Sequence, residues 1–300
     1  MKQFTGFLKR YSLVIGIILM FLLTWPIDLA NSGVLPFQVP FAVYILLGYG
    51  FIFASLIMTG LTLGKEGVIA LLKRFLIWRV GWKWYMVAFL LYPGILLSAV
   101  LLNAALSQIP PDFSIVFAHK IFGPSANLAL LIIPFFLFDA LANGEEIGWR
   151  GYVLPRLQAK YSALVSSLIV GVIWGIWHFP KFMAPGNDSS FTLFMVKVMA
   201  DAILYTWLYN NTKGSLLLVT LFHAAGNTAG VFLPIANTVT GNNMSVLMLQ
   251  VLIQIIVAFV IVIIAGPARL SRTEPKQIQK ASTQLAKAYF PIPSPEKVLK

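Results

Sequence analysis

The sequence predicts an all-α, polytopic transmembrane helix bundle. Of its 300 residues, 59% are hydrophobic and 11% are charged, and the mean hydropathy is +0.84. A water-soluble domain of this size could not cover so much apolar surface. A bilayer core about 30 Å thick, in contrast, is matched by apolar helices of roughly 20 residues, and runs of that length recur along the chain. We therefore expect the bilayer to be the solvent for most of the protein.

Eight apolar windows predict about eight spans. They lie at residues 12–30, 41–63, 84–105, 127–157, 162–179, 191–210, 215–234 and 245–266. The first window follows Lys2, Lys9 and Arg10, as a secretory signal would. It continues past Trp25 with no small-residue cleavage site, however, so we expect an uncleaved first span.

The basic residues predict the orientation of the bundle. The net charge of +12 would suggest nucleic acid in a soluble protein, but here the basic residues fall in linkers between apolar runs, so no nucleic-acid partner is expected. They are concentrated in alternate linkers: Lys65, Lys73, Arg74, Arg79 and Lys83; Arg156 and Lys160; and Lys213. The positive-inside rule then predicts a multi-pass protein of the cell membrane with both termini in the cytoplasm.

Two segments differ from ordinary spans and divide the chain. Residues 1–63 hold the first two helices, and residues 64–83 mix bulky apolar side chains with lysines and arginines, which favours an amphipathic helix in the cytoplasmic interface over a basic loop. Residues 84–266 form the transmembrane core. Residues 267–300 lose apolar periodicity and are expected to be a disordered, basic cytoplasmic tail.

Charged side chains within the spans are functional candidates, because each costs on the order of 3 kcal/mol at the membrane centre. Helical spacing sorts them. Glu146 and Arg150 are four residues apart and can form an ion pair, whereas Glu145 is rotated away by about 100° and remains an unpaired acid. Lys197 and Asp201 are also four apart, and we interpret them as a structural pair. Asp139 has no obvious partner.

Two histidines complete the polar set. His178 lies in the fifth window, and His223 shares a helix face with Asn227 in the seventh. A lone membrane histidine often serves only as a hydrogen-bonding residue between helices. Three helices that each present a Glu or a His instead indicate chemistry, either water activation or a metal site. For these groups to meet, the helix that carries Glu145 must continue past Arg150.

These residues resemble the motifs of a known family. Glu145-Glu146-x-x-x-Arg150, Trp174-x-x-x-His178 and His223-x-x-x-Asn227 follow, in order and spacing, the E-E-x-x-x-R, F-x-x-x-H and H-x-x-x-N/D motifs of the CPBP (Abi) intramembrane proteases, which include the type II CaaX prenyl endopeptidases. The resemblance covers about residues 60–235. Trp174 stands where the family usually has Phe, which affects the expected shape of the substrate pocket.

The resemblance implies a role for each residue. Glu145 would act as general base on a water molecule that His178 helps to orient, while His223 and Asn227 would face the scissile carbonyl, with the Asn227 amide as oxyanion donor. Glu146 and Arg150 would support the geometry. No cofactor is expected, since the chain has no cysteine and Asn is a poor zinc ligand. The alternative is a divalent metal such as zinc, held by Glu145, His178 and His223.

The leading functional hypothesis is therefore an intramembrane endopeptidase that cleaves a membrane-associated peptide from a cytoplasm-facing cavity. A prenylated CaaX peptide is the substrate class that the resemblance implies, and processing of a bacteriocin or signal peptide is equally open. A non-catalytic membrane scaffold or bacteriocin-immunity protein is the alternative. A proton-coupled transporter also fits intramembrane Glu, His and Asp residues, but the sequence lacks the repeat symmetry of such proteins.

Overall fold

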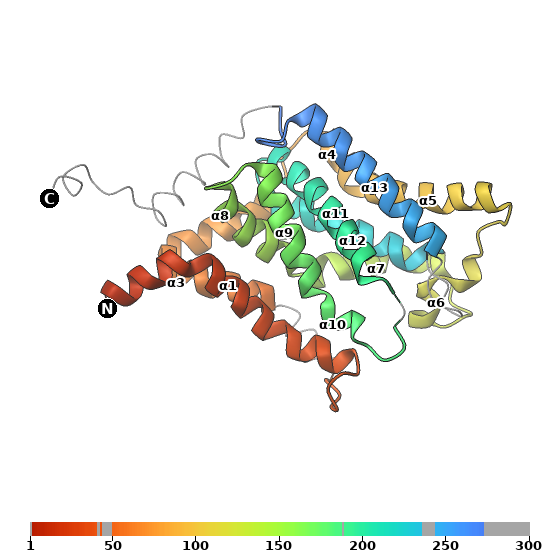
Figure 1. The fold of residues 1–300 in the computed structure, drawn as a ribbon, viewed down its shortest axis with the longest axis horizontal. Helices are drawn as coiled ribbons and strands as arrows, with labels where there is room; N and C mark the ends of the chain where they lie inside the picture. The colour runs from red at the N-terminus through yellow and green to blue at the C-terminus, as the bar shows by residue number, and fades with distance from the viewer. Residues whose placement is uncertain (1, 41–42, 44–49, 188, 236–243, 273–300) are drawn as a thin grey trace.

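The computed structural model describes residues 2–40, 43, 50–187, 189–235 and 244–272. Within these residues all regular structure is helical, which confirms the predicted all-α class. The helices form one elongated bundle in which α9, α11 and α12 lie centrally, flanked by α1 and α3 on one side and by α5 and α13 on the other (Figure 1).

The longest helices coincide with the predicted apolar windows. Five helical stretches are long and apolar enough to cross a membrane: Gly6–Asn31 within α1 (Lys2–Asn31), Gly50–Leu76, Trp82–Ser107, Phe191–Asn211 and Val246–Ala265. The second comprises α3 (Gly50–Leu72) and η1 (Lys73–Leu76), and the third comprises α4 (Trp82–Met86), η2 (Val87–Leu91) and α5 (Tyr92–Ser107). The last two are α11 (Phe191–Asn211) and most of α13 (Met244–Ala265).

The other three windows are helical but do not form simple spans. The window 127–157 is broken into α7 (Leu128–Ala142) and a second helical stretch, with a 40° bend between them, and counts as a sixth candidate span if the two are taken together. Two shorter apolar helices follow, α9 (Ala163–Trp177) and α12 (Leu216–Phe232). By length and composition the described residues thus contain five or six candidate spans, fewer than the eight predicted.

The break in the fourth window lies at Asn143 and Gly144. The Asn143 side chain caps the next helix, because its Oδ1 accepts a hydrogen bond from the backbone N–H of Glu145 at 3.0 Å. From Glu145 the chain is helical to Gln158, through the π-helical η4 (Ile147–Val153) and α8 (Leu154–Gln158). The helix that carries Glu145 therefore does continue past Arg150, as the site requires.

One end of the bundle gathers the basic connections. Ser215 and Lys213, between α11 and α12, donate hydrogen bonds to the carbonyls of Ile77 and Arg79, between η1 and α4. The amide of Ala163, which begins α9, bonds to the carbonyl of Ala268. These connections carry Arg79, Lys160, Lys213, Arg269 and Arg272, and Lys65, Lys73, Arg74, Lys83 and Arg156 lie in the helices next to them. We call this the basic end.

The opposite end is formed by the last turn of α1, by α6 (Phe117–Phe122) and by α10 (Phe179–Phe182). The indole N–H of Trp25 donates to the carbonyl of Trp177, which fixes α1 to the end of α9. Figure 1 shows α6 and α10 far from α8. The connection from α10 to α11 also lies here.

The proposed interfacial segment begins at a change of direction. Gly64 interrupts α3 with φ +70° and ψ −169°, a conformation that a side chain would disfavour, so residues 65–76 form a separate helical piece. Leu76, Trp78 and Trp82 remain exposed. This geometry is compatible with a helix in the interface, which stays a prediction. Most of the predicted tail, from residue 273 onwards, lies outside the described residues.

Candidate active site

Glu145 is held by two indole groups. Its Oε2 accepts hydrogen bonds from Nε1 of Trp174 at 2.8 Å and from Nε1 of Trp149 at 3.3 Å. Trp149 lies four residues after Glu145 on the same helix, whereas Trp174 comes from α9. Among the described residues, Oε1 of Glu145 has no hydrogen-bond donor, so it is available to bind water. The half-buried carboxylate is therefore fixed in place on one side and available on the other.

Glu146 joins the two motif helices. Its Oε1 lies 3.2 Å from Nη1 of Arg150, which confirms the predicted ion pair, and 2.9 Å from Nδ1 of His223. Both Glu146 and Arg150 are fully buried. The pairing of Glu146 with His223 was not predicted, and it connects the stretch 145–158 to α12.

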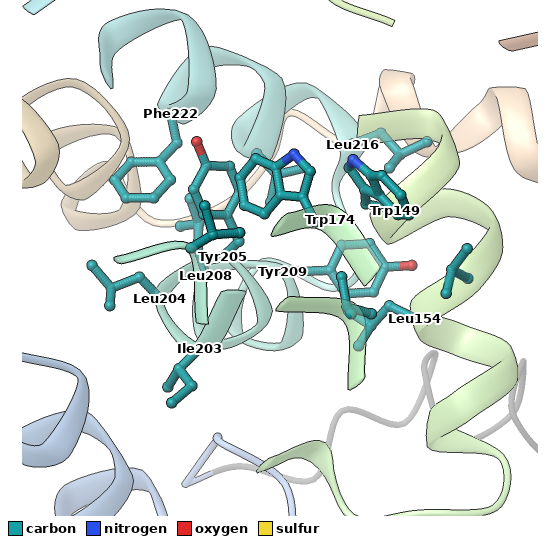
Figure 2. Packing of buried hydrophobic residues seen from close by; sticks show 14 of the residues in the cluster. Trp149, Leu154, Trp174, Ile203, Leu204, Tyr205, Leu208, Tyr209, Leu216 and Phe222 are labelled. Atoms are coloured by element: carbon teal, nitrogen blue, oxygen red, sulfur yellow. The ribbon is translucent and has the colours of Figure 1, made fainter. Parts of the chain in front are cut away.

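The Arg150 guanidinium is also enclosed by aromatic rings. Its Cζ lies 4.7 Å from the ring centre of Trp174 and 4.3 Å from that of Tyr205, within the range of cation–π attraction. The rings of Trp174 and Tyr205 contact each other edge to face, and Figure 2 shows them packed together in the buried core. These contacts leave Arg150 with no route to solvent.

His178 lies at the end of α9, one residue past Trp177. Its Nδ1 is 2.9 Å from the backbone carbonyl of Trp174, which can only accept, so Nδ1 carries the proton. A neutral His178 then offers Nε2 as an acceptor. The rings of Trp177 and Phe194 pack against the imidazole and fix its orientation.

Asn227 pairs with the acid that sequence reasoning left without a partner. Its Nδ2 lies 3.3 Å and 3.2 Å from the two carboxylate oxygens of Asp139 on α7. Asn227 is exposed and lies four residues after His223 on α12. Asp139 therefore belongs to the site, at the point where α7 and α12 pack together.

The second predicted ion pair is present and forms part of a buried network. Nζ of Lys197 lies 2.9 Å from Oδ2 of Asp201. The same carboxylate accepts hydrogen bonds from the Tyr92 hydroxyl at 3.0 Å and from Nε2 of Gln254 at 2.7 Å. The network joins α5, α11 and α13.

A cavity of about 600 Å³ lies beside these groups. His178, His223, Asn227 and Asp139 line it, together with Trp174 and Tyr205. Glu145 is not among the lining residues, but its carboxylate accepts a hydrogen bond from Trp174, which is one of them. Trp174 is thus the one described residue that hydrogen-bonds Glu145 and also packs near both histidines, with ring centres 6.0 Å from His178 and 5.7 Å from His223.

The structure therefore brings Glu145, His178 and His223 around one indole ring, and places Asn227 one helical turn beyond His223. The fourth window is broken at Asn143 and Gly144, but the helix that carries Glu145 begins directly after this break and continues past Arg150. Glu145 remains next to α9, where Trp174 donates a hydrogen bond to its carboxylate.

A comparison with protein families supports the motif assignment. Residues 125–229 match the family described as "Type II CAAX prenyl endopeptidase Rce1-like". This segment is therefore similar to that family. The matched segment includes every residue of the three motifs, from Glu145 to Asn227, and also Asp139.

A curated relative shows the same similarity. CAAX prenyl protease 2 of Methanococcus maripaludis is 28% identical over 148 residues, which cover 46% of this chain and 52% of the relative. The match therefore spans about half of the relative's length. The similarity to these prenyl proteases therefore covers only part of this chain, residues 125–229 in the family match.

Two residues around the motifs, Trp149 and Tyr205, were missed from the sequence, and the hydrogen bond of Trp174 to Glu145 was not predicted. Trp149 is four residues from Glu145, and Trp174 is four residues from His178, so helical spacing could have placed both indoles on the motif faces. Tyr205 gave no such signal, because it reaches the site only through the packing of α11 against α9.

The metal alternative gains no support from the arrangement of side chains. Across the described parts of the chain, no group of three or more His, Asp or Glu side chains is placed to hold a metal ion. The residues present do not fit a zinc site in this conformation, so no metal enters the proposed mechanism.

Proposed function

We propose that this protein is an intramembrane endopeptidase that hydrolyses a peptide bond with a water molecule activated by Glu145. It is a multi-pass protein whose termini both lie in the cytoplasm. The observation that carries the proposal is the environment of Glu145, where two indole N–H groups fix one carboxylate oxygen and leave the other available for water. A scaffold or immunity protein would not require such an arrangement.

The chemical steps follow from the positions of the groups. Glu145 takes a proton from water, the water oxygen bonds to the scissile carbonyl carbon, and the carbonyl oxygen becomes an oxyanion. The C–N bond then breaks, and the proton on Glu145 passes to the leaving amine, which restores the carboxylate. His178, protonated at Nδ1, accepts a hydrogen bond from the attacking water at Nε2.

His223 and Asn227 support the oxyanion. Glu146 accepts from Nδ1 of His223, and in its protonated form the imidazole also carries a proton on Nε2, which it donates to the oxyanion. Asp139 holds the amide of Asn227 at the cavity surface, where its N–H groups are suited to stabilise negative charge without ionising. Removal of one such donor typically costs about 10²–10³ in rate.

The substrate is a membrane-associated peptide. The curated relative is named as a prenyl protease, which makes a prenylated CaaX peptide the first substrate to test. The cavity wall includes Phe117, Ile121, Phe135 and Phe182, which suit an apolar or lipid-bearing substrate segment.

Glu145→Gln tests the function directly. Purified protein in detergent is incubated with a farnesylated CaaX peptide, and membranes of cells that express each form are searched by mass spectrometry for new peptide termini. We expect the variant to lose at least about 10²-fold in cleavage, because the amide keeps the indole hydrogen bonds but cannot take a proton. Activity should survive exhaustive chelation.

Glu66→Gln, the same change at an exposed site in the basic segment, is the matched control and should cleave normally. If Glu145→Gln membranes contain the same new termini as the wild type, the protease assignment is wrong. Loss of cleavage on chelation with recovery on added Zn²⁺ would replace the metal-independent mechanism.

A further inference from the structure

The cavity lies at the end of the bundle opposite the basic connections. Beyond the motif residues, it is lined by Phe117 and Ile121 of α6, by Lys181 of α10, and by Asn187, Ser189 and Ser190 in the connection to α11. All of these belong to the end where α6 and α10 lie, remote from α8 (Figure 1). His178 also lies there, since it follows the last residue of α9, whose first residue is at the basic end.

Glu145 shows the same placement. Its carboxylate accepts a hydrogen bond from Trp174 in the last turn of α9, and Trp25 of α1 donates to the carbonyl of Trp177 in the same turn. The end of α1 in turn packs against α10. The acid, the first histidine and the cavity mouth therefore all lie towards the end without the basic connections.

Towards the basic end, the site is closed by a fully buried layer. Every residue of η4 is buried, and Trp149, Arg150 and Tyr152 have no exposed surface. Tyr209, one helical turn after Tyr205 on α11, is also fully buried and accepts a hydrogen bond from Arg74 of η1. This layer lies between the site and the basic connections, and it leaves no passage for a peptide.

The distribution of charge identifies the two ends. The basic end carries Lys65, Lys73, Arg74, Arg79 and Lys83, with Arg156, Lys160, Lys213, Arg269 and Arg272. The connections at the opposite end carry Lys120 and Lys181, and the segments 41–49 and 236–243 contain no charged residue. Such an asymmetry places the basic end in the cytoplasm.

We infer that the cavity opens to the non-cytoplasmic face of the membrane, so that the substrate enters from that side. That a peptide substrate exists rests on the proposed function. The side from which it enters rests on the position of the cavity and on the distribution of basic residues. The sequence led us to expect a cavity that faces the cytoplasm. In this fold, however, the cavity lies at the end opposite the basic connections, so it cannot face the cytoplasm if the basic end does. The substrate class narrows to peptides whose scissile bond is exposed at or anchored in the non-cytoplasmic leaflet.

The absence of cysteine allows a direct test of this direction. Three single-cysteine variants serve as probes: Ser189→Cys in the cavity, Ser125→Cys on the exposed connection before α7, and Lys65→Cys at the basic end. Each is expressed in spheroplasts and treated with a membrane-impermeant maleimide before or after lysis. We expect Ser189→Cys and Ser125→Cys to label in intact spheroplasts, and Lys65→Cys to label only after lysis.

Two results would overturn the inference. If Lys65→Cys labels in intact spheroplasts and Ser125→Cys does not, the molecule has the opposite orientation. If Ser125→Cys labels from outside but Ser189→Cys does not, the cavity does not open to that face. The labelling does not depend on catalysis, and the cleavage assay in detergent does not depend on the side from which the substrate enters. An error in the direction of entry can therefore be distinguished from an error in the protease assignment.

Discussion

At the residue scale, Trp174 has a larger role than the sequence suggested. The family usually has Phe at this position, and the substitution was expected to alter pocket shape alone. The structure shows that the indole N–H donates to Oε2 of Glu145, which a phenyl ring cannot do. In this chain Trp174 therefore positions the carboxylate of Glu145, the proposed base, through a hydrogen bond.

Trp174→Phe tests this role. The variant keeps an aromatic ring against Tyr205 and the histidines but loses the hydrogen bond to Glu145. A hydrogen bond to a charged group contributes about 1.5–3 kcal/mol, so we expect kcat to fall by about one to two orders of magnitude with little change in KM. Trp25→Phe is the matched control, because it removes an indole hydrogen bond of another helix, from Trp25 of α1 to the carbonyl of Trp177. Equal losses in both variants would contradict the positioning role.

Asp139 and Asn227 should act as one unit. Their side chains contact each other across 88 residues of sequence, so either one alone is expected to lose its orientation when the other is removed. We predict that Asp139→Ala, Asn227→Ala and the double variant have similar kcat values, with a coupling energy of about 0.5–3 kcal/mol in a double-mutant cycle. Fully additive losses would show that Asp139 does not act through Asn227.

At the scale of elements, two glycines allow α9 to pack closely on α11. Gly171 and Gly175 form a GxxxG pattern, and both face α11 closely: a Cβ on Gly171 would lie 2.9 Å from the Cα of Met199. The bend between α7 and the stretch 145–158 was not predicted. Asn143 and Gly144 are residues that often end a helix, but the apolar residues on both sides of them led to the expectation of one span over 127–157.

Gly171→Ala should destabilise the packing of α9 on α11. The added methyl group meets backbone rather than the end of a flexible side chain, so the helices must separate, at a cost of about 1–3 kcal/mol. We expect a lower Tm in detergent by thermal-shift measurement. Gly94→Ala in α5 is the matched control, because nothing lies within 4 Å of the place that its new methyl group would occupy. A Tm as high as that of Gly94→Ala would contradict close packing at Gly171.

At the scale of the whole molecule, a buried polar network connects helices from distant parts of the chain. Asp201 on α11 binds Lys197 on its own helix, Tyr92 on α5 and Gln254 on α13. Helical spacing predicted the pair of Lys197 and Asp201. It could not predict the other two partners, because their contacts depend on how three helices pack together.

Asp201→Asn should destabilise the whole bundle, because it leaves the ammonium of Lys197 without its counter-ion. Breaking a buried pair at one partner typically costs about 3–5 kcal/mol, whereas apolar replacement of both partners is often much better tolerated. We therefore expect Lys197→Met/Asp201→Leu to recover much of the Tm that Asp201→Asn loses in detergent. A double variant less stable than Asp201→Asn would show that the loss of stability comes mainly from the broken hydrogen bonds of the network and not from the unpaired charge of Lys197.

The sequence by itself determined the helical class, the basic asymmetry and the order and spacing of the three motifs. These features depend on composition, on the i, i+4 period of a helix and on the order of short motifs, all of which are local. The ion pairs Glu146–Arg150 and Lys197–Asp201 were predictable for the same reason, because four residues of helix place both partners on one face.

The tertiary structure alone decided which groups meet and where the cavity opens. His223 pairs with Glu146 across 77 residues, and Asn227 with Asp139 across 88, distances over which no local pattern carries information. The direction of the cavity follows from the buried layer around Arg150 and Tyr209, which exists because η4, α9 and α11 pack their aromatic faces together. Charge patterning orients the bundle in the membrane, but packing determines the face at which its site opens.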